Sequence, residues 1–189
     1  MASFKVCALN EKYSKIWDFN VSQSRNSEPY HKYSWLKYLE LKSNTKLYLF
    51  YVKFNGKFIC LFPVFVKNFA SLNLIFSPPP FLGIPYLGPI FLNIENYTQS
   101  KQEDLISQSF KQTNKLFTEK FKSVYYQYLF TPKIYDIRSF SQENFSILPR
   151  YTYSVPIESI EKNMERLSPS VRREIRKVDR KGIIFREGD

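Results

Sequence analysis

The stretch LYLFYVKFNGKFICLFPVFV, residues 47–66, decides the fold class. Two runs of aromatic and β-branched residues, a composition typical of strands, flank the pair Asn55-Gly56. Both central residues of a type I′ turn need positive φ, so this pair predicts an antiparallel hairpin of residues 47–54 and 57–66. Pro63 has no backbone N–H to donate, and its place in the second run predicts a bulge or a sheet edge.

Helices and strands are also predicted on the C-terminal and N-terminal sides of this hairpin. Apolar residues at helical spacing predict helices over residues 28–41 and 98–121, and apolar runs predict strands over residues 72–76, 124–130 and 151–157. The segment SPPPFLGIPYLGPIF, residues 77–91, contains five prolines and two glycines, which exclude a regular helix. This pattern predicts an α/β fold with a mixed, mostly antiparallel sheet flanked by helices.

A change of character at Glu158 suggests a second region. Two densely charged helices are predicted over residues 160–167 and 169–181, with Ser168-Pro169 as the cap and first-turn pair between them. Gly182 fits the position just after a helix, and IIFRE then reads as a strand. We therefore expect a first lobe over residues 1–157, and junction helices with the first strand of a second lobe over residues 158–189. A strand left unpaired at its edge predicts that the natural chain continues.

Composition and charge limit the classes of protein. The chain of 189 residues is 43% hydrophobic and 18% aromatic, which is typical of a folded domain. No apolar run is long enough to span a membrane, the N-terminus lacks a secretory leader, and two Cys cannot make a disulfide framework, so we expect a cytoplasmic protein. The net charge of +11 favours anionic partners, although an acidic segment elsewhere could also balance it.

The residues that commonly carry out covalent or metal chemistry are scarce. One His and two Cys cannot form a common zinc site, so no metal is expected. Cys60 lies in an apolar run, which favours a buried inert thiol, and His31 is predicted to be a surface or packing residue. The five glycines form neither a nucleotide loop nor a loop that could bind the pyrophosphate of coenzyme A. No cofactor cradle is therefore visible.

The helix SVRREIRKVDRK, residues 170–181, has the highest density of positive charge in the chain. Guanidinium groups match phosphate in two-point contacts, so this helix could bind RNA or a nucleotide-linked substrate. The alternative is a solvated basic face, with Val171, Ile175 and Val178 packed inward on the first lobe. Both interpretations stay open at this stage.

The order of these elements resembles the FemAB-like peptidyltransferases and their GNAT-fold relatives. The stretches that are similar are PYHKYSWLKYLE (29–40), NGKFICLFPVFV (55–66), SPPPFLGIPYLGPIF (77–91) and the long segment from YTYSVPI to KGIIFRE (151–187). The resemblance implies two GNAT-like lobes with the reacting groups held in the cleft between them. It also implies transfer of an acyl or aminoacyl group from an ester or thioester to an amine, a reaction that depends on orientation and oxyanion donors.

From this resemblance we expect an acyltransferase with its N-terminal half in this chain, and no transfer by this half alone. Lys37, the nearest match to an acceptor-binding lysine of the family, and Arg172, Arg173 and Arg176 are the residues expected to bind substrate, while the catalytic residues stay unassigned. The expected partners are a small-molecule or nucleotide-linked amine, the second lobe and an acyl-coenzyme A or aminoacyl-tRNA donor. The alternative function is a non-catalytic basic module that binds nucleic acid or another polyanion.

Overall fold

The predicted hairpin lies at the centre of the sheet in the computed structural model, which describes residues 3–184 except 71, 135, 152, 154 and 155. Strand β2, Lys46–Phe54, pairs antiparallel with β3, Lys57–Phe69. Asn55 and Gly56 have φ angles of 48° and 81°, the positive values that this turn requires. The hairpin prediction is confirmed.

The described residues form one six-stranded sheet in the order β1-β2-β3-β4-β6, with β5 paired to β3. Strand β1, Phe4–Leu9, and strand β4, Leu72–Ser77, are antiparallel to their neighbours β2 and β3. Strand β6, Ser123–Tyr128, is parallel to β4, and the two-residue β5, Ile90–Phe91, is antiparallel to β3. The predicted α/β fold with a mostly antiparallel sheet is confirmed.

Pro63 corrects one expectation, because it lies at neither a bulge nor an outer edge of the sheet. Strand β3 is an inner strand, and the register shift of the hairpin falls between Val52 and Lys53. On its other side β3 pairs with β5 at residues 60–61 and with β4 at residues 65–69, so Pro63 occupies the gap between these two partners. A residue without an N–H fits there because no ladder bond is lost.

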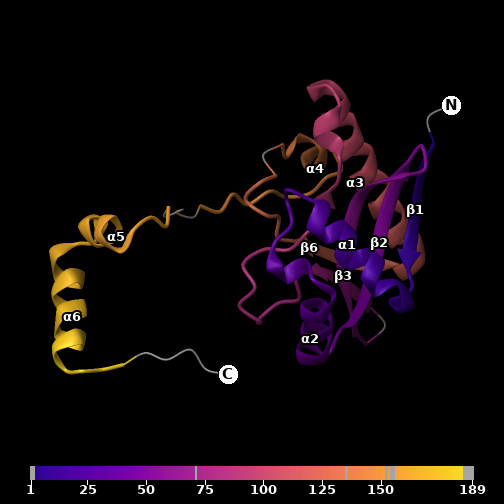
Figure 1. Ribbon diagram of the computed structural model, residues 1–189. Coiled ribbons are helices and arrows are strands. Elements are labelled where there is room, and N and C mark those ends of the chain that lie inside the picture. Colours follow the sequence, from indigo (N-terminus) through magenta and orange to yellow (C-terminus); the bar gives the residue numbers. More distant parts are fainter. Residues whose placement is uncertain (1–2, 71, 135, 152, 154–155, 185–189) are drawn as a thin grey trace. The chain divides into compact units, whose positions relative to one another are not determined.

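Helices cover both faces of the sheet (Figure 1). Helices α1, Ser14–Gln23, and α2, Tyr33–Ser43, pack on one face through Trp17, Val21, Leu36 and Leu39. Helices α3, Gln99–Phe121, and α4, Arg138–Gln142, pack on the other face. Short 3₁₀ turns precede α1, α2 and α3 at Glu11–Tyr13, Pro29–His31 and Ile94–Asn96. The helix predicted from Glu28 therefore begins as the second of these turns, and the helix predicted over 98–121 is confirmed.

Aromatic side chains fill the core between the sheet and α3. Phe117 of α3 is fully buried, with ring centroids 4.7 Å from Phe50 and 5.5 Å from Phe62. Tilted and edge-on ring pairs at these distances add to the stabilisation from apolar burial. The aromatic residues of the hairpin runs are thus largely core residues, as their continuous apolar setting predicts.

The chain divides into two compact units, residues 1–147 and residues 148–189. The second contains α5, Ile160–Arg166, and α6, Pro169–Arg180, close to both predicted helices. Gly182 has a φ of 63° after α6, as expected for a helix end. The predicted strand over 151–157 is wrong at its described residues, which lie in no strand, and Tyr151, Tyr153 and Ile157 are more than 90% exposed. The strand predicted after Gly182 lies mostly outside the described residues, and the assignment of two lobes stays a prediction.

Candidate substrate-binding site

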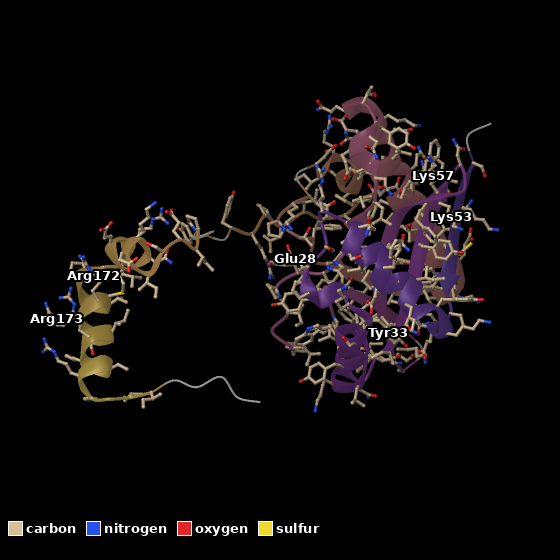
Figure 2. All side chains as sticks on the ribbon, in the orientation of Figure 1. Glu28, Tyr33, Lys53, Lys57, Arg172 and Arg173 are labelled. Atoms are coloured by element: carbon tan, nitrogen blue, oxygen red, sulfur yellow. The ribbon has the colours of Figure 1, made fainter. Side chains whose placement is uncertain are left out.

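The surface of the first unit has two depressions, and Lys37, the predicted acceptor-binding lysine on α2, lines the more open one. One is a cleft of about 370 Å³ at the start of β2, and the other is a more open depression of about 580 Å³ along α2. Tyr33, marked in Figure 2, lines the cleft, and Lys46 lines both depressions. The cleft has the further lining residues Ala8, Leu9, Asn10, Glu11, Leu47, Tyr48 and Leu49.

Two carboxylates already bind the ammonium group of Lys37. Its Nζ donates to Glu11 Oε1 at 3.1 Å and to Glu40 Oε2. Glu40 in turn accepts a hydrogen bond from the backbone N–H of Leu47 at 2.8 Å and lies 3.8 Å from Lys46 Nζ. The hydrogen bond from Lys37 to Glu40 raises the pKa of Lys37 to about 12, so this lysine is charged at neutral pH.

Glu40 stays ionised within this network. Its partial burial favours the neutral acid, but hydrogen bonds from Lys37 and Leu47 outweigh burial and hold the pKa of Glu40 below its usual value. Because Lys37 shares its charge with Glu11 and Glu40, an anionic ligand would have to compete with both carboxylates. The structure thus places Lys37 at the more open depression and adds two acidic partners that the sequence pattern did not reveal.

The chain segment at Leu87 pairs with the residues that follow β6, where β4 and β6 end. Leu129 N donates to Ser77 O at 2.8 Å, and Leu87 N donates to Leu129 O at 2.7 Å. Gly88 N donates to Ser77 Oγ at 3.2 Å, and a Cβ at Gly88 would lie 3.0 Å from the ring of Phe130. The lack of a side chain at Gly88 lets the backbone pack closely against Phe130. This space is therefore filled by the protein itself and does not form a cradle for a phosphate.

His31 holds this segment against the turn before α2. Nδ1 accepts a hydrogen bond from the backbone N–H of Glu28 at 3.1 Å, so Nε2 carries the proton and donates to Leu87 O at 3.2 Å. Burial lowers the pKa of His31 below its usual value, and the hydrogen bonds to backbone groups only partly oppose this. His31 is predicted to be a surface or packing residue, and its full burial supports packing and corrects the surface alternative.

The three predicted arginines lie together on α6 in the second unit. Arg173 and Arg176 are exposed and Arg172 is half-exposed, and Figure 2 shows Arg172 and Arg173 projecting from the helix. No carboxylate whose side chain the structure describes lies within ion-pair distance of these three, whereas the neighbouring Lys177 pairs with Glu174 at 2.6 Å. Their guanidinium groups are accessible to a phosphate or carboxylate.

Other kinds of site find little support in the described residues. They contain no group of three or more His, Cys, Asp or Glu side chains that could hold a metal ion. Burial raises the pKa of the Cys60 thiol, which makes the reactive thiolate scarce at neutral pH. Among the helices formed by the described residues, none combines the length and the apolar character needed to cross a membrane.

Comparison with known proteins gives only distant structural matches. No family model and no curated relative matches the chain. A ribosomal-protein-alanine N-acetyltransferase from Brucella melitensis biovar Abortus 2308 is 9% identical, with a TM-score of 0.41 over 82% of this chain and 99% of that one. The aminoglycoside N-acetyltransferase AAC(6′)-Iy, solved in complex with CoA, is 15% identical, with a TM-score of 0.39 over 82% of this chain and 96% of that one. Matches this distant say nothing about the reaction of this chain.

Proposed function

We propose that this chain supplies the acceptor-binding part of an acyl- or aminoacyltransferase of the GNAT and FemAB type. The proposal rests on the topology of the first unit. Two helices separate β1 from β2, four strands run antiparallel, and α3 then crosses over to the parallel strand β6. This is the arrangement expected of the GNAT-like lobe to which the sequence is similar.

The proposed reaction joins an amine to an acyl carbon. The amine nitrogen attacks the carbonyl of an ester or thioester, the new C–N bond forms, and the C–O or C–S bond breaks. The amine loses a proton, which the leaving alcohol or thiol takes up. Such a transfer needs orientation of the amine and stabilisation of the carbonyl oxygen more than it needs a nucleophilic side chain or a metal.

The donor side of this reaction is assigned to a second lobe. Pyrophosphate binding needs closely spaced backbone N–H groups at the start of a helix. In this chain β4 leads to α3 through the proline-rich segment and β5, and Gly88 in that connection packs against Phe130. The described residues of the first unit therefore do not fit coenzyme A. Acyl-coenzyme A and aminoacyl-tRNA both remain proposed donors.

The acceptor side is assigned to Arg172, Arg173 and Arg176, with Lys37 as a further proposed contact. Their accessible guanidinium groups suit an amine that is linked to a phosphate, such as a nucleotide-linked peptide. Lys37 belongs to a different compact unit, and its charge is shared with two carboxylates. We therefore expect the larger part of the anion binding from α6.

A titration of the protein with a uridine-diphosphate-linked peptide that bears a free amine tests this assignment. The double variant Arg172→Ala/Arg176→Ala should lose about 1–3 kcal/mol of binding free energy per charged contact, with little change in melting temperature. Arg180→Ala/Lys181→Ala is the matched control, because it removes the same charge from the end of the same helix. Equal losses in both variants, or no binding by the unchanged protein, would refute the assignment.

The second candidate function is a basic module that binds nucleic acid without acyl chemistry. The accessible arginines of α6 favour it as well, because phosphate contacts from Arg need no catalytic partner. Binding of single-stranded RNA that weakens steeply with salt, together with no affinity for the amine, would select this module over the transferase.

A further inference from the structure

The outer face of α2 exposes apolar side chains that a surface helix normally hides. Trp35 is 41% exposed, Tyr38 is 49% exposed and Leu41 is 77% exposed, and these residues follow one another at intervals of three. The rings of Trp35 and Tyr38 meet edge-on at 5.7 Å. Single exposed apolar residues are common, but a continuous group of them marks a surface that binds something.

The same group continues beyond α2 in the proline-rich segment. Tyr30 links the two regions, with its ring 5.9 Å from Trp35 and 6.1 Å from Tyr86. Phe81, in the loop between β4 and Tyr86, is 99% exposed and has a φ of 67°, an unusual conformation for a bulky residue. We define the aromatic surface as Trp35, Tyr38, Leu41 and Tyr86, and Phe81 is a further exposed aromatic residue of the proline-rich segment.

Positive charge accompanies the aromatic surface. Residues 32–43 contain three Lys and one acidic residue, Glu40, which is paired with Lys37. Lys32 and Lys42 are exposed, and Lys42 Nζ lies 5.8 Å from the ring of Tyr38. No carboxylate among the described side chains forms an ion pair with either lysine. The charge beside the aromatic surface is therefore positive and unneutralised.

This combination fits the surface of an anionic membrane better than it fits a protein groove or a nucleic acid. Leu41 projects from a helix, so it can enter a soft layer of acyl chains. Trp and Tyr favour the level of the lipid headgroups, and nearby Lys favours anionic lipids. Nucleobases would need open ring faces, whereas the rings of Tyr30, Trp35 and Tyr38 are engaged with one another.

We propose that the aromatic surface docks the protein onto an anionic phospholipid membrane, with Trp35 and Tyr38 at the headgroup level and Leu41 inserted more deeply. Lys32 and Lys42 then lie against the lipid headgroups. This mode of binding is peripheral, because α2 lies along the interface and does not cross it. Tyr38 and Leu41 also line the more open depression beside Lys37, but the inference needs no part of the acyl-transfer chemistry proposed above.

The two Trp residues of the chain provide a direct spectroscopic test. Trp17 is fully buried, so a change in emission on addition of vesicles reports on Trp35. The probes are phosphatidylcholine vesicles with and without phosphatidylglycerol. We expect a blue shift of emission and co-sedimentation with the anionic vesicles only. In the Trp35→Phe variant the shift should disappear while co-sedimentation persists.

Two variants locate the surface that binds. Tyr38→Glu/Leu41→Glu should weaken partitioning onto anionic vesicles at least about tenfold, because it places charge among the acyl chains. Val124→Glu/Ile137→Glu adds the same charge at residues that are 60% and 43% exposed elsewhere in the first unit, and it should bind as the unchanged protein does. Equal weakening in both variants would overturn the proposal, as would vesicle binding without a shift of Trp35 emission.

A third variant excludes binding through α6. Arg172→Ala/Arg176→Ala removes two exposed charges from the second unit and should leave the shift of Trp35 emission in place. If this variant abolishes vesicle binding while Tyr38→Glu/Leu41→Glu keeps it, the membrane contact belongs to α6 and the proposal fails. Failure of this proposal would not decide the proposed transfer function, because the test of that function uses an amine ligand and no lipid.

Discussion

The two compact units differ in how their sequences specify structure. In the described residues every buried hydrophobic side chain lies between Trp17 and Phe140, within the first unit. The described residues of the second unit include no buried hydrophobic side chain, and several are exposed, among them Ile160 at 78% and Val171 at 44%. Long-range packing therefore stabilises the first unit, whereas caps and helix-ending residues define the helices of the second. We expect substitutions to disturb folding in the first unit and ligand binding in the second.

The largest effect on stability is expected at Phe117 in the core of the first unit. Phe117→Ala should lower the free energy of unfolding by about 3–5 kcal/mol, because it leaves a cavity among Phe50 and Phe62. Denaturant unfolding followed by circular dichroism measures this loss. Ile175→Ala on α6 is the counterpart in the second unit, and it should change the same transition by less than about 0.5 kcal/mol. Similar losses in the two variants would remove the distinction between the units.

A smaller effect is expected at His31, the only His in the chain. Its pKa in the folded protein lies below the usual value of 6.5, so below pH 6.5 the unfolded chain binds more protons than the folded one. The stability that neutral His31 provides is complete above pH 6.5 and is lost as the pH falls from 6.5 through the lower pKa of the folded state.

The His31→Gln variant sharpens this prediction. Loss of the imidazole should cost about 1–3 kcal/mol at neutral pH, because the N–H of Glu28 or the carbonyl of Leu87 loses a buried partner. The unchanged protein should lose stability as the pH falls just below 6.5, and carboxylates do not cause this loss because they titrate at lower pH. The variant should not show this loss. Unchanged pH dependence in this variant would show that His31 titrates as it does in the unfolded chain.

Sequence alone predicted the elements that have strong local signals. The Asn55-Gly56 turn, the long apolar stripe of α3 and the Ser168-Pro169 start of α6 each have a short-range physical cause. Strand β1 and helix α1 were missed. In α1 only Trp17 and Val21 are buried, so its amphipathic pattern is weak, and β1 pairs with a strand that is distant in sequence. The strand predicted over 151–157 is wrong at its described residues, because an apolar run does not ensure a pairing partner.

The candidate site was predictable only in part. Lys37 and the three arginines can be selected by residue type, but the pairing of Lys37 with Glu11 joins residues 26 positions apart. The pairing of Leu87 with Leu129 also depends on contacts across the fold, and the bond from His31 to Leu87 spans 56 positions. Such contacts arise from tertiary packing, which no local pattern encodes.

The most direct test of the proposed function is transfer of a radiolabelled acyl group to an amine acceptor. The donors to compare are acyl-coenzyme A and aminoacyl-tRNA, with a nucleotide-linked peptide as acceptor, and the proteins to compare are residues 1–189 and the longest product of the gene. We predict that the longest product transfers the label if it carries a second lobe, and that residues 1–189 alone bind the acceptor without turnover. Turnover by residues 1–189 alone would contradict the proposal that the donor binds to a second lobe. RNA binding without transfer by either protein would contradict the proposed transferase function.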